Sequence, residues 1–140
     1  MNPYSIFVEA HSGIRYLVLV IGVIAVAYAA YGMVSRPAWS NLANQIAAAF
    51  VWITRINLII GIILWVWKLS QFGWASLGTT FGILHPLLMI AALGVMEALD
   101  ARRKRQTGDS DKWRLLLIGS TVPLILIALG VYVVTLMPVM

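Results

Sequence analysis

The chain is a series of long apolar stretches separated by short polar segments. Four stretches carry at most one charged residue each: Tyr16 to Ser35, Pro37 to Trp67, Leu69 to Met96 and Leu115 to Met140. A helix of about 20 apolar residues is long enough to cross the hydrocarbon core of a bilayer. The pattern therefore predicts an all-α membrane protein with four transmembrane helices, over about residues 6–34, 42–68, 79–101 and 113–137.

The composition agrees with this prediction and excludes a water-soluble domain. Of the 140 residues, 61% are hydrophobic and 11% are charged, and the mean hydropathy is +0.91. A soluble chain has about 45–50% apolar and about 25% charged residues. The length favours one domain over residues 1–140. Short connections predict an up-down-up-down bundle, in which the first and third helices face each other diagonally.

The first apolar stretch is predicted to be a helix of the protein rather than a signal peptide. Its start carries Glu9 and His11 where a signal peptide has a basic segment, and its apolar run is long enough to span a membrane. Asn2 followed by Pro3 is typical of a helix N-cap with proline at the first helical position. We therefore expect His11 to lie about two turns inside the helix.

The basic residues predict how the bundle sits in the membrane. One cluster lies between the third and fourth helices: Arg102, Arg103, Lys104, Arg105, Lys112 and Arg114. Short loops rich in Lys and Arg remain in the cytoplasm. We therefore expect a multi-pass membrane protein with both termini outside, in which the cluster contacts anionic lipid and not nucleic acid.

The tryptophans fit the same orientation. An aromatic belt places tryptophan at both membrane–water interfaces. We expect Trp65, Trp67 and Trp74 at the outer interface, and Trp39 and Trp113 at the inner one.

Four ionisable residues inside the predicted helices are the candidates for function: His11, Arg15, Arg55 and His85. Such residues are costly within a membrane and usually face the interior of the bundle. The two histidines, the only ones in the chain, are expected at similar depths in the outer half, on the diagonal helices. This arrangement predicts that His11 and His85 are the axial ligands of one haem b, which suits electron transfer. Because the chain has no cysteine, thiolate metal sites are excluded.

The two arginines complete the predicted cofactor site. Arg15 lies one turn from His11 and is expected to bind a haem propionate. Arg55 lies near the middle of the second helix, with Thr54 and Asn57 beside it and no obvious carboxylate partner. It is expected to reach a propionate or a quinone oxygen, or to line a polar cavity. Three glycines are expected to let helices approach the haem: Gly13, Gly61 and Gly82.

Each of these residues also has a structural interpretation. His11 is at a depth where an interfacial histidine would contact water, and Arg15 is at one where its side chain would extend to the headgroups. His85 precedes Pro86, which frees a backbone carbonyl for a local hydrogen bond. Arg55 is explained equally by a structural ion pair. On the fourth helix, Gly119, Gly130, Ser120 and Thr121 are interpreted as close-packing positions.

Three segments resemble small bacterial four-helix membrane proteins described as cytochrome b-like. The start His11-Ser12-Gly13-Ile14-Arg15-Tyr16 is similar to the family's His-Ser-x-x-Arg-aromatic motif, and Gly61 to Trp65 is similar to its Gly-x-x-Leu-aromatic segment. His85 to Met89 is similar to its His-x-x-x-Met segment. The resemblance implies a b-type cytochrome of the bacterial inner membrane with His11 and His85 as ligands. This chain differs from the family at Arg55, where members often have a histidine.

The leading hypothesis is therefore a membrane b-type cytochrome or cytochrome-like electron-transfer subunit. Its expected partners are a quinol or a periplasmic electron carrier. The alternative is a haem-free structural or assembly subunit of a larger respiratory or photosynthetic complex. A homo-oligomer is compatible with both hypotheses. A small transporter in which Arg55 binds an anion is a third interpretation, without the internal repeat that such proteins often have.

Overall fold

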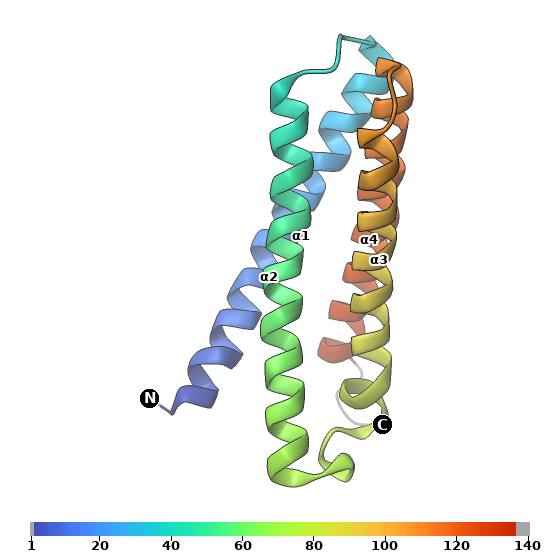
Figure 1. The fold of residues 1–140 in the computed structure, drawn as a ribbon. Coiled ribbons are helices and arrows are strands. Elements are labelled where there is room, and N and C mark those ends of the chain that lie inside the picture. Colours follow the sequence, from blue (N-terminus) through green and yellow to red (C-terminus); the bar gives the residue numbers. More distant parts are fainter. Residues whose placement is uncertain (1, 137–140) are drawn as a thin grey trace.

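The protein folds as a bundle of long helices that alternate in direction (Figure 1). The computed structural model describes residues 2–136. Its α-helices are α1 (Pro3–Ser35), α2 (Asn41–Phe72), α3 (His85–Lys104) and α4 (Asp109–Leu136). A short 3₁₀ turn, η1 (Trp74–Ser76), and a π-helical turn, η2 (Thr80–Leu84), lead into α3. Within residues 2–136 there is no β-strand.

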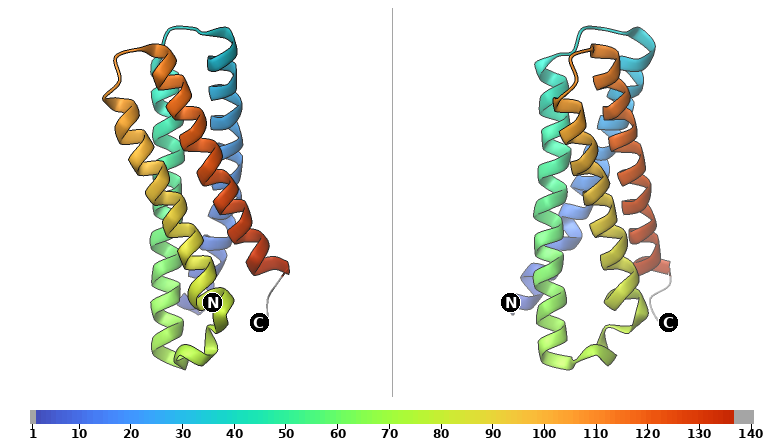
Figure 2. Two further views of the ribbon diagram at one scale, coloured as in Figure 1. Left: turned by 90° about the vertical axis from the view of Figure 1, so that its right-hand side faces the viewer. Right: turned by 45° about the vertical axis from the view of Figure 1, so that its right-hand side comes forward.

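The helix order around the bundle is the predicted one. α1 packs against α2 and α4, and α3 packs mainly against α4 and more sparsely against α2. α1 and α3 are therefore diagonal to each other, as Figure 2 shows in two further views. The loops α1–α2 and α3–α4 lie at one end of the bundle, and the start of α1 lies toward the other end (Figure 1).

All four predicted spans are present. Four helical segments are long and apolar enough to cross a membrane, with η2 and α3 forming one continuous segment over Thr80–Lys104. Large apolar side chains such as Val34, Ile59 and Leu87 are exposed on the outside of the bundle. In water such a surface would be unfavourable, whereas lipid tails would cover it.

Local sequence signals explain where α1 and α2 begin. The Asn2 side chain accepts a hydrogen bond from the backbone N–H of Tyr4 at 3.0 Å, and Pro3 is the first helical residue. This is the predicted cap, and α1 starts three residues before the approximate prediction of residue 6. The Ser40 side chain caps α2 in the same way, by accepting from the N–H of Ala43.

The basic loop is shorter than predicted. Residues 102–104 form the last turn of α3, where positive charge is favoured, and α4 begins at Asp109 rather than near residue 113. Asp109 and Asp111 lie in the first turn of α4, where the helix dipole favours negative charge. The predicted end of this helix at residue 137 lies outside the described residues.

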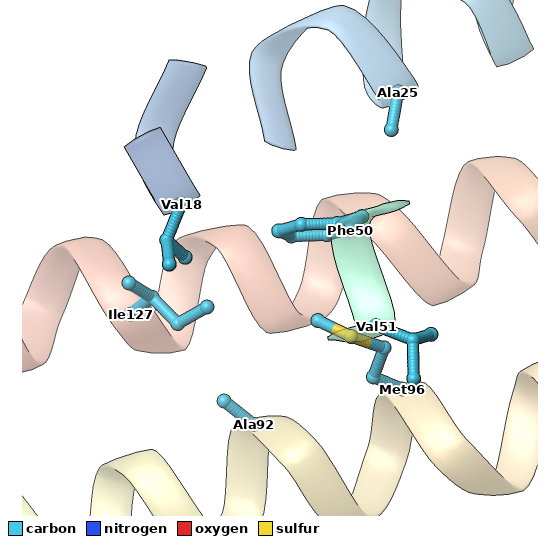
Figure 3. Packing of buried hydrophobic residues seen from close by; sticks show 7 residues of the cluster. All are labelled: Val18, Ala25, Phe50, Val51, Ala92, Met96 and Ile127. Atoms are coloured by element: carbon cyan, nitrogen blue, oxygen red, sulfur yellow. The ribbon is translucent and has the colours of Figure 1, made fainter. Parts of the chain in front are cut away.

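The hydrophobic core occupies the middle of the bundle and the end that carries the two helix–helix loops. Figure 3 shows the central cluster, to which all four helices contribute: Val18, Ala25, Phe50, Val51, Ala92, Met96 and Ile127. A second cluster surrounds Trp113 near the loops, with Ala29, Ala43, Ala47 and Leu116. Both clusters interleave large side chains with alanine, which lets the helices pack closely.

Trp113, which was expected at the inner interface, is buried near the α1–α2 loop. Its side chain is 1% exposed and packs against Gly32, where an added Cβ would lie 2.1 Å from the ring. Its indole N–H donates to the carbonyl of Pro37 at 2.9 Å. Trp113 therefore belongs to the core cluster at the end of the bundle that carries the two helix–helix loops.

Candidate histidine site

The two histidines meet inside the bundle. The ring centres of His11 on α1 and His85 at the start of α3 are 6.3 Å apart, and the ring planes are perpendicular. The two residues are 74 positions apart in sequence and come from diagonal helices. The structure thus brings together the two residues that the sequence predicted as a pair.

A backbone carbonyl of α2 positions His11. Its Nδ1 lies 3.1 Å from the carbonyl oxygen of Asn57. Because a carbonyl can only accept, Nδ1 carries the proton and donates it. Gly61, one turn further along α2, lies against the ring, and a Cβ there would be 2.9 Å from Cε1 of His11. His11 is therefore packed against a neighbouring helix and is not simply an interfacial histidine in contact with water.

His85 is positioned in the same manner by α4. Its Nδ1 donates to the carbonyl of Gly130 at 3.2 Å. This partner lies on another helix, so the alternative of a local bond to the carbonyl freed by Pro86 is wrong. His85 follows directly after the π-helical turn η2, and π-helical turns occur frequently at functional sites. The turn and Pro86 together set the direction in which the imidazole leaves the helix.

Both imidazoles therefore have the hydrogen-bonding arrangement of a histidine that binds a metal. A histidine that binds a metal usually donates its other ring N–H to a carbonyl or carboxylate, which fixes the tautomer. Here both Nδ1 atoms donate to carbonyls, which leaves the lone pair on each Nε2 available. For both rings the printed contact to a backbone carbonyl is made by Nδ1.

The separation of the two ring centres can be compared with that of two imidazoles that share one metal ion. A metal–imidazole bond is about 2 Å, and a ring nitrogen lies about 1 Å from its ring centre, so two imidazoles on opposite sides of one ion have centres about 6 Å apart. The observed separation is 6.3 Å. The described residues include no group of three or more His, Cys, Asp or Glu that could hold a metal. Haem iron, unlike zinc, needs only two protein ligands, because the porphyrin supplies the others.

The glycines near the site differ from those predicted. Of the three expected glycines, only Gly61 contacts a histidine. A Cβ on Gly13 would meet no atom within 4 Å, and Gly82 lies against Leu77 and Trp74. The second glycine at the site is Gly130, which was predicted only as a packing position. A Cβ there would be 2.3 Å from Met89 and 3.4 Å from Nδ1 of His85.

Arg15 lies on α1, four residues after His11, and is the nearest basic residue to it in the sequence. Its Nη2 donates to the Tyr16 hydroxyl at 3.2 Å, and its guanidinium carbon lies 4.9 Å from the centre of the Tyr16 ring. Its Nε is buried and has no hydrogen-bond partner among the described residues. The side-chain oxygen of Asn57 is also buried and unpaired. Unsatisfied polar atoms of this kind are rare in folded proteins and call for an explanation.

Arg55 forms an ion pair, which was one of its predicted interpretations, and the partner, Glu97, is the part that the sequence analysis did not identify. Its Nη2 donates to Oε2 of Glu97 on α3 at 2.6 Å, and its Nε donates to Oε1, which makes the pair bidentate. Thr54 bonds instead to the Phe50 carbonyl at 2.7 Å and does not assist Arg55. Glu97 is 12 residues beyond His85, about 18 Å along a helix. The guanidinium therefore joins α2 to α3 away from the histidine pair.

Arg103, which was predicted as one charge of the basic loop, has a buried side chain with hydrogen-bond partners. Its side chain is 4% exposed and donates to Oδ1 of Asp100 at 2.7 Å and to the side-chain oxygen of Asn44 at 3.0 Å. The guanidinium also lies over the Trp39 ring. This network holds α3 to α2 near the α3–α4 loop.

No family model, curated protein or solved structure matches this chain in the comparisons with known proteins. The functional inference therefore depends on the geometry of the site.

Proposed function

We propose that the protein is a small membrane b-type cytochrome, or a cytochrome-like electron-transfer subunit, with one haem b held by His11 and His85. One observation carries the proposal: two inward-facing imidazoles lie 6.3 Å apart, and each donates its Nδ1 proton to a backbone carbonyl. This is the donor set of a bis-histidine site. The resemblance to cytochrome b-like proteins implies the same two ligands.

The residues around the histidines would hold and orient the cofactor. The carbonyls of Asn57 and Gly130 fix the two rings, and the absence of a side chain at Gly61 and Gly130 leaves room for them. The unpaired Nε of Arg15 is available to a propionate, because a guanidinium binds carboxylates well. A haem with two histidine ligands supplies reversible one-electron transfer without an open coordination position.

The apolar spans and the basic residues support the proposed place of the protein in the cell. We infer that the protein is a multi-pass protein of the bacterial inner membrane with the basic α3–α4 loop in the cytoplasm and both termini outside. The start of α1 and the histidine pair then lie toward the outer face. The electron donor or acceptor would be a quinol in the membrane or a periplasmic carrier.

The absorption spectrum of the purified protein is the deciding experiment. We expect protein from haem-replete cells to show a low-spin bis-histidine spectrum that sharpens on reduction. We expect His11→Ala and His85→Ala each to abolish haem retention. Leu84→Ala is the matched control, because Leu84 is the neighbouring residue but its side chain faces outward.

Two results would contradict the proposal. A colourless wild-type protein with both histidines intact would overturn it, as would full haem retention by His85→Ala. Colourless protein that co-purifies in fixed stoichiometry with respiratory or photosynthetic subunits would favour the alternative of a haem-free structural or assembly subunit.

Reporter fusions test the topology separately. We expect a fusion within residues 106–108 to report a cytoplasmic location, and a fusion before α1 to report an external one. The opposite pattern would reverse the orientation while leaving the histidine site unchanged.

A further inference from the structure

The Arg55–Glu97 pair lies on the outside of the bundle, within two helical segments that are long and apolar enough to cross a membrane. Arg55 is near the middle of α2, about 21 Å from its start at 1.5 Å per residue. The side chains of Arg55 and Glu97 remain 33% and 39% exposed. Charged groups within a membrane span normally face the bundle interior or a water-filled cavity.

The pair is incompletely satisfied by its own chain. The bidentate contact uses Nε and Nη2 of Arg55, and Nη1 has no hydrogen-bond acceptor among the described residues. The Trp52 ring lies beside the guanidinium, 4.7 Å from ring centre to Cζ, and is itself 59% exposed. Arginine and tryptophan are the residues most enriched at the energetic centres of protein interfaces. The pair is therefore neutral as a whole and keeps one donor, Nη1 of Arg55, for a partner from outside the chain.

The surface of α3 beside the pair carries small residues. Gly94 lies one turn before Glu97, and a Cβ on it would meet no atom within 4 Å. Ala98 and Ala101 continue the same exposed strip of small residues. Small residues spaced four apart let two membrane helices approach closely. We call the exposed set Trp52, Arg55, Gly94, Glu97 and Ala98 the α2–α3 face.

We propose that the α2–α3 face is the interface through which two copies of this chain form a two-fold dimer. The face carries one positive and one negative charge side by side, so a two-fold rotation places the Arg55 of one copy toward the Glu97 of the other. Such a face is complementary to itself, as a two-fold interface requires. Gly94 and Ala98 would allow the two α3 helices to touch.

A small lipid-soluble ligand such as a quinone fits this face less well. Small-molecule sites are concave, whereas the face is an open helix surface. A cavity of about 20 Å³ on the inner side of α3 is lined by Phe50, Met96 and Arg103 but by neither Arg55 nor Glu97. The observations thus favour a helical partner over a bound small molecule.

The oligomeric state in mild detergent tests the proposal. We expect wild-type protein to have the mass of two chains and Gly94→Leu to have the mass of one, with unchanged helix content. Gly13→Leu is the matched control, since Gly13 is also an exposed glycine with no atom within 4 Å of its Cβ; it should remain a dimer. A monomeric wild type, or a dimer that tolerates Gly94→Leu, would overturn the proposal.

Cysteine cross-linking in native membranes provides a second test that does not depend on detergent. The chain has no cysteine, so a single introduced thiol can form only one kind of homodimer. We expect Ala98→Cys to give a disulfide-linked dimer on mild oxidation and Gly13→Cys to give at least tenfold less. Equal cross-linking at both positions, or a cross-link of Ala98→Cys to a protein of another mass only, would overturn the proposal.

Discussion

The two ends of the bundle satisfy their polar groups differently. At the end with the helix–helix loops, which we call the basic end, buried Arg103 donates to Asp100 and Asn44, and the Trp113 indole donates to Pro37. At the other end, which we call the histidine end, the Nε of Arg15 and the side-chain oxygen of Asn57 are buried without partners.

The difference in hydrogen bonding indicates that the two ends of the bundle have different roles. At the basic end the buried guanidinium of Arg103 and the indole of Trp113 have their hydrogen-bond partners within the chain. The histidine end has two fixed imidazoles, two glycines against them and unpaired polar atoms. Buried polar atoms normally have partners, so this end has the features of a site for a group that the chain does not supply. Substitutions at the basic end should therefore affect stability, and substitutions at the histidine end should affect cofactor binding.

The largest loss of stability is expected for Trp113→Ala. The side chain is almost fully buried against Gly32 and Ala29, so its removal leaves a large cavity. Such substitutions cost about 3–5 kcal/mol of unfolding free energy. Thermal or detergent-induced unfolding followed by circular dichroism measures the loss. An unfolding midpoint equal to that of wild type would show that the basic end is not the stable part of the bundle.

Arg103→Ala is expected to cost about 3 kcal/mol, because it leaves the carboxylate of Asp100 partly buried with only Lys104 beside it. Arg114→Ala is the matched control. The Arg114–Asp111 pair is exposed, with side chains 60% and 49% accessible, and should contribute at most about 1 kcal/mol. The same unfolding measurement compares the two variants. Equal losses would contradict the distinction between a buried network and surface charges.

Gly61→Val tests the histidine end. The added side chain would collide with the His11 ring, and overpacking of this kind costs about 1–3 kcal/mol. If the ring must move, haem affinity should fall about 10-fold to 100-fold. Haem titration of the purified variant measures the change, with Gly13→Val as the control at an open position. Unchanged haem affinity in Gly61→Val would mean that the position of the His11 ring does not affect haem binding.

Asn57→Leu should have the smallest effect on stability. It removes an unpaired buried oxygen but keeps the backbone carbonyl that accepts from His11. The haem-free protein should therefore be unchanged or more stable by about 1 kcal/mol. Unfolding of wild type and variant without haem gives the comparison. A loss of more than about 1 kcal/mol would show that Asn57 already has a structural partner in the haem-free protein.

The elements that the sequence predicted best depend on local or periodic signals. The four apolar spans follow from run length, and the start of α1 follows from the Asn2–Pro3 cap. The diagonal placement of His11 and His85 also followed from the order of four antiparallel helices. These predictions needed only the spacing of residues along one helix and the rule that short loops join neighbours.

The features that the sequence did not predict depend on contacts between helices. Arg55 and Glu97 are 42 residues apart, and their pairing depends on how the turns η1 and η2 set the position of α3 along α2. The role of Gly130 beside His85 depends on the register between α3 and α4 in the same way. Glu97 lies on the third predicted helix and could have been considered as the partner of Arg55. The sequence, however, did not specify which faces of the helices meet.

For this protein, the sequence by itself determined that the chain forms four membrane-length helices and that two histidines lie at similar depth on diagonal ones. Both conclusions depend on hydrophobicity and helix geometry, which act locally. Only the tertiary structure decided that both imidazoles donate to backbone carbonyls, that Arg103 and Trp113 are buried, and that the Arg55–Glu97 pair faces outward. Those features depend on helix rotation and register, which are fixed by side-chain packing across the whole bundle.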